Sequence, residues 1–387
     1  MTRILIIGGG PAGAAAGITA KRLGIDTLLI EQGNRNRDKI CGDCLIQDSQ
    51  EALKKLGVLD KVRERGMFLQ EAMVYGMRGE KIPLSSPVYT LQRTVLDQIL
   101  RDEYEKDGDI LYNTHIDKIS SDTDIVKVID RSGKEYKGDV AILATGASVN
   151  LAKQLGFEYE TAPAAAIRGY MRNNGVDKMF FWFDKSVFPG YGWAFPVPGN
   201  LLNVGVGYFQ IRRPKKKLPE LLDDLVSGDA GKIVGKEWVS KPESWPLRTG
   251  LKRDAVKDRV LLVGENAHTT YDFSGEGIGK AMFSGIIAAE TISTAKSFSS
   301  EGLSNYEDLL SGFSIVYESY KKVMKAFLNP ITNYVLTKLI EHSREGRRLI
   351  ERSLREESLP EDIASIKKAL GIDNKITKFL YTRFLTH

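Results

Sequence analysis

The chain has 387 residues, of which 42% are hydrophobic and 27% are charged, a balance typical of a globular protein and not of a disordered one. This length is enough for roughly two or three domains. No apolar run reaches the roughly 18–20 residues that a membrane-spanning helix needs, and residues 4–7 are too short for the apolar part of a signal peptide. We therefore expect a cytoplasmic protein, with attachment to the inner face of the membrane as the alternative.

The net charge of +5 does not indicate nucleic-acid binding, because acidic residues are interspersed and no basic stripe carries aromatic residues. The basic run 212–217 favours a solvated loop, with an anionic partner or a lipid surface as the alternative. Two cysteines, Cys41 and Cys44, and scattered histidines do not have the spacing of a zinc site. We expect neither a metal nor a nucleic-acid partner.

The first 31 residues have the pattern of a strand, a glycine-rich turn, a helix and a second strand. The apolar run 3–7 leads into Gly-x-Gly-x-x-Gly, a helix is expected over 11–23, and the strand 27–30 is followed by Glu31. Such glycines permit a tight turn, close approach of the backbone to a pyrophosphate and close helix packing. The helix N-terminus binds phosphate, and the acid accepts hydrogen bonds from a ribose. We expect dinucleotide binding, with a structural turn as the alternative, at Gly8, Gly10, Pro11, Ala12, Gly13, Glu31 and Gln32.

The elements that follow alternate between helical and strand patterns. Helices are expected over residues 49–65, 93–104 and 276–294 and through the charged region from about 300. Strands are expected over residues 72–75, 87–90, 110–112, 125–129, 140–144, 179–183, 202–206 and 260–263. Residues 160–250 are rich in aromatic residues, glycine and proline, which favours an antiparallel sheet in a second domain.

A second glycine-bearing segment runs from the strand end at Val263 through Gly264 and Glu265 to a helix start near Gly277. It resembles the second flavin motif of the para-hydroxybenzoate-hydroxylase-like flavoproteins. In that family an acid contacts the ribityl chain and the helix N-terminus faces the pyrimidine edge of the flavin, where its dipole stabilises negative charge. Here the acid is Glu and not Asp. The resemblance implies that FAD is bound by Gly264, Glu265, Gly275, Gly277 and Ile278.

An arginine at the start of a predicted helix, Arg93, matches the family arginine that lies near the FAD phosphates. The alternative is an exposed arginine at a helix start. Three further segments narrow the resemblance: 39–43 (Lys-Ile-Cys-Gly-Asp), 191–196 (Tyr-Gly-Trp-Ala-Phe-Pro) and 274–278 (Ser-Gly-Glu-Gly-Ile). Together they resemble the geranylgeranyl reductase family, whose members carry a Cys-Gly pair near the flavin, here Cys41 and Gly42. The resemblance covers about residues 1–295 and implies reduction of isolated double bonds of a polyprenyl chain by FADH2.

An unactivated alkene is a poor hydride acceptor, so protonation must accompany hydride delivery. Cys41 is the candidate proton donor, and the alternative is an inert buried thiol. Tyr191, Trp193 and Phe195 are the candidates for lining an apolar substrate tunnel, and the first two could also stabilise developing positive charge. The alternative for these aromatic residues is ordinary core packing.

Other flavin chemistries stay open. Hydroxylases of the superfamily carry Asp-Gly where this chain has Thr145-Gly146, which argues against aromatic hydroxylation. No second Gly-x-Gly-x-x-Gly is present that would form a separate nicotinamide domain. The sequence leaves the electron donor open between NAD(P)H and another reduced carrier. The alternatives are a flavin-dependent monooxygenase or halogenase acting on a small aromatic or hydrophobic substrate, a non-catalytic flavin-binding protein, and a disulfide reductase that uses Cys41 and Cys44.

We predict an α/β fold with a Rossmann-like FAD-binding domain, an inserted α+β substrate domain of antiparallel sheet and a helical C-terminal region. The FAD-binding domain is expected to be discontinuous, over residues 1–70, 91–150 and 255–297. The substrate-binding domain is expected over residues 71–90 and 151–254, and the helical region over residues 298–387. An apolar face with lysines over residues 313–327 predicts an amphipathic helix, which either lies on a membrane or packs on the body of the protein. His268 is expected either near the flavin ring or in a packing role.

Overall fold

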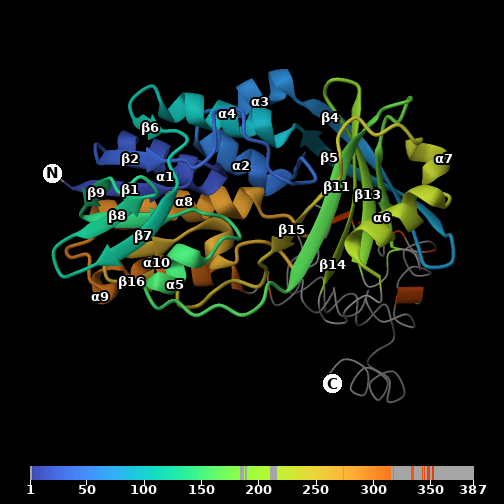
Figure 1. Cartoon of the computed structure of the whole chain (residues 1–387). Coiled ribbons are helices and arrows are strands. Elements are labelled where there is room, and N and C mark those ends of the chain that lie inside the picture. Colours follow the sequence, from blue (N-terminus) through green and yellow to red (C-terminus); the bar gives the residue numbers. More distant parts are fainter. Residues whose placement is uncertain are drawn as a thin grey trace, which may run out of the picture.

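The computed structural model describes residues 2–314 apart from 184–186, 188–189, 210–215 and 273. Beyond 314 it describes Tyr317, Asn333, Tyr334, His342, Arg344, Arg347, Arg348, Glu351 and Arg352. Two large sheets lie next to each other, each with helices on a face (Figure 1). The predicted C-terminal amphipathic helix and most of the basic run fall outside the described residues.

Within the described part of the chain, the first sheet has six strands in the order β16-β17-β10-β1-β2-β6. In that order they are Val256–Lys257, Val260–Leu262, Val140–Leu143, Arg3–Ile7, Asp26–Ile30 and Asp109–Leu111. All neighbours pair in parallel except β16 and β17. The central strands are apolar and buried, as parallel strands covered on both faces must be. The carboxyl ends of β1, β2, β10 and β17 therefore meet at one edge, where loops can build a site.

Helices α1 (Pro11–Arg22) and α8 (Ile278–Thr294) cross closely on one face of this sheet. A Cβ at Gly285 would lie 2.1 Å from the main-chain oxygen of Ala12, so only glycine allows this approach. Helix α4 (Arg93–Tyr104) packs beside α1. Shorter helices complete this side of the molecule: α2 (Gln47–Lys55), α3 (Leu59–Arg65), α5 (Asn150–Gln154), α9 (Ser300–Leu303) and α10 (Asn305–Ser311). A small antiparallel sheet accompanies them, with β7 (Ile116–Ser121), β8 (Val126–Asp130) and β9 (Glu135–Gly138).

The second sheet has eight strands among the described residues, in the order β15-β11-β14-β13-β12-β4-β5-β3. They are Glu243–Leu247, Ala164–Arg172, Leu201–Phe209, Gly190–Val197, Met179–Trp182, Met67–Tyr75, Lys81–Thr90 and Cys44–Leu45. Neighbours are antiparallel except for the parallel pair β12 and β4. Helices α6 (Leu218–Ser227) and α7 (Gly231–Val234) cover one face. The other face carries an aromatic cluster turned toward the first sheet.

The predicted elements agree with the structure in type, and they differ at their ends. The helix expected over 49–65 is two helices, because Gly57 has a φ of +70° that no helix contains. The helix expected over 276–294 begins at Ile278, because Gly277 before it has a non-helical φ of −159°. Strands β3, β7, β9, β15 and β16 were not predicted, since they are short or exposed and lack an apolar pattern. Strands β11 and β13 lie in the segment expected to form an antiparallel sheet, but the sequence did not place them individually. No described helix is long and apolar enough to cross a membrane.

Candidate active site

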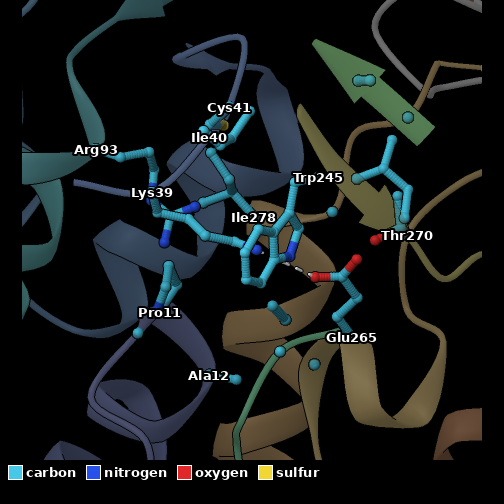
Figure 2. A pocket seen from close by; sticks show the side chains of 18 of the residues that line it. Pro11, Ala12, Lys39, Ile40, Cys41, Arg93, Trp245, Glu265, Thr270 and Ile278 are labelled. Atoms are coloured by element: carbon cyan, nitrogen blue, oxygen red, sulfur yellow. Dashed lines mark ion pairs between the residues drawn. The ribbon is translucent and has the colours of Figure 1, made fainter. Parts of the chain in front are cut away.

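A cavity of about 800 Å³ lies where the two large sheets meet (Figure 2). Its wall includes the turns at the carboxyl ends of β1, β10 and β17, the segment 37–44, and the aromatic face of the second sheet. Every residue assigned from the sequence to the cofactor or the substrate lies in this wall except Gly13. The cavity thus joins a glycine-rich polar part to an apolar aromatic part.

The three glycines of the first turn have different roles. Gly8 has a φ of +111°, and a Cβ there would lie 2.4 Å from the oxygen of Ala144. A Cβ at Gly13 would lie 1.9 Å from the oxygen of Gly8, so this glycine serves helix–strand packing. At Gly10 the nearest atoms to a Cβ are guanidinium nitrogens of Arg93 and Arg37, at 3.9 and 4.0 Å. Gly10 therefore opens onto the cavity between two cations at the uncapped N-terminus of α1, an arrangement that fits a diphosphate.

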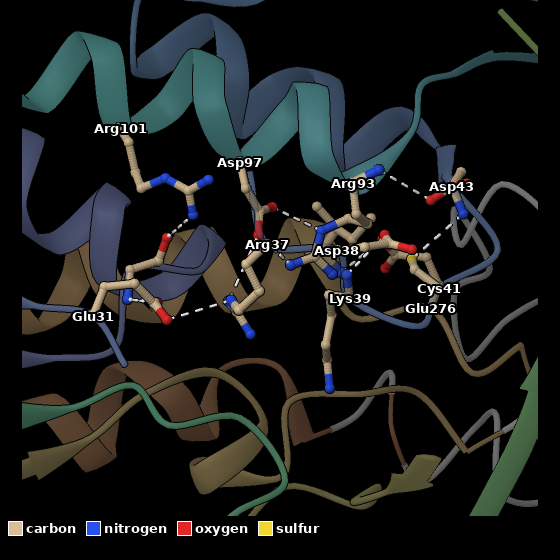
Figure 3. A network of polar contacts seen from close by, with 12 residues as sticks. Glu31, Arg37, Asp38, Lys39, Cys41, Asp43, Arg93, Asp97, Arg101 and Glu276 are labelled. Atoms are coloured by element: carbon tan, nitrogen blue, oxygen red, sulfur yellow. Dashed lines mark hydrogen bonds and ion pairs between the residues drawn. The ribbon is translucent and has the colours of Figure 1, made fainter. Parts of the chain in front are cut away.

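Glu31, at the end of β2, has both of its oxygens engaged. They accept hydrogen bonds from the N–H of Gly9 (2.8 Å) and of Gly33 (2.7 Å). Arg37 forms an ion pair with Glu31 at 3.3 Å, and its buried Nε has no hydrogen-bond partner among the described residues. Glu31 thus orients the glycine turn and Arg37, while it still lines the cavity. Figure 3 shows this polar network along the segment that follows β2.

Arg93 begins α4 as predicted, and the alternative of an exposed arginine is wrong, because the residue is 7% exposed. Its guanidinium donates two hydrogen bonds to Asp97, of 2.8 and 3.0 Å. Although burial alone would lower it, the nearby Asp97 carboxylate raises the pKa of Arg93 above its usual range. Arg93 is therefore a fixed positive charge beside Gly10 and Cys41.

The second glycine turn meets the first one. Gly264 has a φ of +59°, and a Cβ there would lie 2.9 Å from the Cβ of Ala12. The turn, a short 3₁₀ helix η1 (Gly264–Ala267), points Glu265 into the cavity (Figure 2), where it accepts the N–H of Arg248 at 3.1 Å. Asn266 accepts the N–H of Thr145 at 3.0 Å and so fixes the loop after β10. Three strand ends that are distant in sequence converge here.

The Cys41 segment follows β2 in sequence but is bonded to the second sheet. The side chain of Asn203, on β14, donates to the oxygen of Cys41 at 2.7 Å and accepts from the indole N–H of Trp193 at 2.9 Å. Arg168, on β11 and 3% exposed, donates to Asp38 and to the oxygen of Cys41. The residues that would touch a substrate and the cysteine therefore belong to one rigid unit.

Asp43 is fully buried in this unit and has a φ of +60°. Its carboxylate accepts hydrogen bonds from the hydroxyl of Tyr170 (2.6 Å), from Asn203 (2.8 Å) and from the N–H of Arg93 (3.2 Å). Burial raises the pKa of Asp43 to about 6, against the opposing effect of the Tyr170 hydroxyl. These bonds hold a non-glycine residue in the left-handed conformation.

The thiol of Cys41 lies in the cavity wall and is not in a disulfide bond. Burial raises the pKa of Cys41, while the Arg93 guanidinium opposes that shift. The thiol accepts the N–H of Asp43 at 3.4 Å. Cys41 is thus held in the protonated form at neutral pH, which suits a proton donor and not a redox thiolate.

The predicted aromatic residues form part of a larger wall. Tyr191 lies 5.8 Å from Trp193 between ring centroids, and Phe195 lies 5.1 Å from Phe181. Tyr191 also donates a hydrogen bond to the oxygen of Ser274, which connects this wall to the loop before α8. The side chains that the sequence did not single out here are Phe181, Phe183, Met179 and Leu247. Because these residues line the cavity, they do more than pack a core.

Several residues of the site were given no role from the sequence. Arg37, Arg168, Asn203 and Trp245 lie outside every motif, and Lys39 lies in the segment 39–43 but was not assigned a role of its own. Just before α8, Glu276 accepts a hydrogen bond from the hydroxyl of Ser49 at 3.0 Å. Burial together with the charge of Asp48 raises the pKa of Glu276 to about 8.

His268, which the sequence placed either near the flavin ring or in a packing role, is not in the cavity wall. Burial lowers the pKa of His268 to about 4.

Comparison with known proteins identifies the class. Residues 1–189 match the FAD binding domain family. The menaquinone reductase of Mycobacterium tuberculosis is 28% identical over 316 residues, which cover 75% of this chain and 76% of the relative. The digeranylgeranylglycerophospholipid reductase of Methanocaldococcus jannaschii is 27% identical over 329 residues, covering 79% and 81%. The chain is an FAD-dependent oxidoreductase.

Solved structures agree on the fold. A geranylgeranyl bacteriochlorophyll reductase-like protein from Thermoplasma acidophilum superposes with a TM-score of 0.81 at 20% identity, over 95% of this chain and 99% of that one. Klebsiella pneumoniae HpxO complexed with FAD and uric acid superposes with a TM-score of 0.73 at 17% identity, over 92% and 96%. The resemblance to geranylgeranyl reductases that the sequence indicates is thus confirmed, and FAD is the cofactor.

Proposed function

We propose that the protein saturates carbon–carbon double bonds of a polyprenyl lipid, with reduced FAD as the hydride source. The observation that carries this proposal is a single cavity whose wall joins the two glycine turns to the aromatic face of β12 and β13, with Cys41 between them. A polyprenyl chain offers no charge, so an apolar wall is the surface that can recognise it. Relatives whose names specify menaquinone and digeranylgeranylglycerophospholipid support a prenyl substrate.

We assign the cofactor to the polar part of the cavity. The diphosphate lies at the N-terminus of α1, between Arg37 and Arg93, and Glu265 contacts the ribityl chain. The start of α8, with Gly275, Gly277 and Ile278, faces the flavin ring. In this assignment residues 1–70, 91–150 and 255–297 hold FAD, and residues 71–90 and 151–254 hold the substrate.

The bound cofactor in its reduced form supplies the hydride, and the chain itself must supply the proton. We assign that proton to the thiol of Cys41, which burial keeps protonated. When the proton leaves, the thiolate faces the Arg93 guanidinium and accepts the N–H of Asp43, so the charge is stabilised where it forms. The faces of Trp193 and Tyr191 stabilise positive charge that develops on the alkene, and the apolar wall excludes water.

The test is an anaerobic incubation of the dithionite-reduced enzyme with a geranylgeranyl lipid or a menaquinone in detergent, followed by mass spectrometry. We expect products heavier by pairs of hydrogens, and we expect Cys41→Ser to form them at least about tenfold more slowly because a hydroxyl is a weaker acid. Unchanged lipids would overturn the proposal. Oxygen consumption that depends on a small aromatic substrate would instead show a monooxygenase or halogenase. Stopped-flow reduction with NADH and NADPH then identifies the donor or excludes both.

A further inference from the structure

Lys39 is a positive charge in the cavity wall that neither the cofactor motifs nor the proton chemistry uses. Four cationic side chains line the cavity within the described residues: Arg37, Lys39, Arg93 and Arg168. Three of them pair with carboxylates near the first glycine turn or the second sheet: Arg93 with Asp97, Arg37 with Glu31 and Arg168 with Asp38. The ammonium group of Lys39 points toward Glu265 and Trp245, in the part of the cavity that Cys41 and the start of α8 also line (Figure 2).

The ammonium group of Lys39 is confined but incompletely satisfied. Its Nζ lies 3.7 Å from an oxygen of Glu265 and 4.5 Å from the centroid of the Trp245 ring. Its side chain is 17% exposed, and no hydrogen bond from Nζ to another described residue accompanies the ion pair. An ammonium group has three N–H donors, and here only one carboxylate and one aromatic face lie next to it. Lys39 can therefore donate a hydrogen bond to an acceptor that enters the cavity.

The main chain of Lys39 is fixed, so the position of the charge is set by the fold. Its N–H donates to Asp38 at 2.8 Å, and its oxygen accepts from Arg168 at 3.2 Å. Burial lowers the pKa of Lys39, and the charge of Glu265 opposes that shift. A negative charge that binds in the cavity would stabilise the protonated form of Lys39, in the same direction as the charge of Glu265.

We propose that Lys39 stabilises the negative charge that the flavin ring acquires on reduction. The proposal rests on the cofactor site assigned above, but not on the identity of the substrate. Two electrons from an external reductant and one proton convert bound oxidised FAD into its anionic reduced form. The α8 N-terminus and Lys39 then face that charge from two sides, so Lys39 favours the reduced over the oxidised cofactor.

The test is potentiometry of the bound cofactor in the holoenzyme, together with dissociation constants for oxidised and reduced FAD. We expect Lys39→Met to bind oxidised FAD within about threefold of the wild type and reduced FAD about tenfold more weakly. For a two-electron couple, that tenfold change makes the midpoint potential about 30 mV more negative. Lys39→Arg, which keeps the charge, should restore most of the potential. Lys39→Gln is the second variant if the methionine variant does not fold.

Lys252→Met is the matched control. The side chain of Lys252 is also largely covered, at 9% exposed, and its ammonium lies 2.6 Å from Asp254, but Lys252 lies outside the cavity wall, so the potential should not change. Equal weakening of oxidised and reduced FAD in Lys39→Met would place Lys39 at the phosphates or the ribityl chain and overturn the proposal. An unchanged potential with unchanged affinities would overturn it as well. Because no alkene is present, failure of the lipid assay leaves this result untouched.

Discussion

The side-chain amide of Asn203 donates a hydrogen bond of 2.8 Å to the carboxylate of Asp43, although 160 residues separate the two. The same amide group also donates to the main-chain oxygen of Cys41 and accepts the indole N–H of Trp193. One side chain therefore fixes the cysteine to the aromatic wall. Asn203→Leu would leave buried polar groups without partners. We expect it to lower the free energy of unfolding by about 2–4 kcal/mol, measured by urea denaturation. The exposed Asn36→Ala is the control, and it should change that value by less than about 0.5 kcal/mol.

The first glycine turn permits a test that separates cofactor binding from folding. At Gly10 a Cβ meets no protein atom closer than 3.9 Å, so Gly10→Ala should fold normally and yet weaken FAD binding at least about tenfold, because the methyl group occupies the approach of the diphosphate. At Gly13 a Cβ would lie 1.9 Å from a main-chain oxygen, so Gly13→Ala should fail to fold or melt far lower. Thermal unfolding and FAD titration distinguish the two. Normal FAD affinity in Gly10→Ala would contradict the assigned diphosphate position.

The buried thiol of Cys41 predicts slow alkylation. Because burial raises its pKa, the thiolate fraction at pH 8 is smaller than in a free cysteine. We expect iodoacetamide to modify Cys41 at least about tenfold more slowly than a model peptide, measured by mass spectrometry in the Cys44→Ser variant. The Cys44→Ser variant should also retain FAD-dependent activity. Fast modification of Cys41 together with loss of activity in Cys44→Ser would favour a redox dithiol.

Glu276 makes stability depend on pH in a defined direction. Its pKa is about 8 in the folded protein, above the ordinary value of 4.5, so the folded state holds a proton that the unfolded state has released. This contribution is fully present below about pH 4.5 and is lost as the pH rises through about 8. Glu276→Gln removes the effect. Its free energy of unfolding should therefore rise relative to the wild type by an amount on the order of 4 kcal/mol between pH 5 and pH 9. A difference that stays constant across this range would contradict the shifted pKa.

The sequence predicted the parts of the site that depend on short-range patterns. The glycine turns, Glu31, Arg93 and the aromatic residues of β13 follow from spacing within one strand–turn–helix unit or from a family motif. Arg168 and Asn203 could not be predicted, since each lies in an apolar strand and its partner Cys41 is more than 120 residues away. Short edge strands such as β15 were missed for a related reason, because their pairing and not their composition defines them.

The bonding of the Cys41 segment to the second sheet determines what moves together. Residues 38–44 follow β2 of the first sheet, but Arg168, Tyr170 and Asn203 hold them, and Cys44 pairs with β5. The same segment is also held from the other side, by the N–H of Arg93 at Asp43 and by the ion pair between Lys39 and Glu265. In the proposed reaction, a rotation that broke these two contacts would carry Cys41 and Lys39 together with the aromatic wall, and the reverse rotation would return both at once.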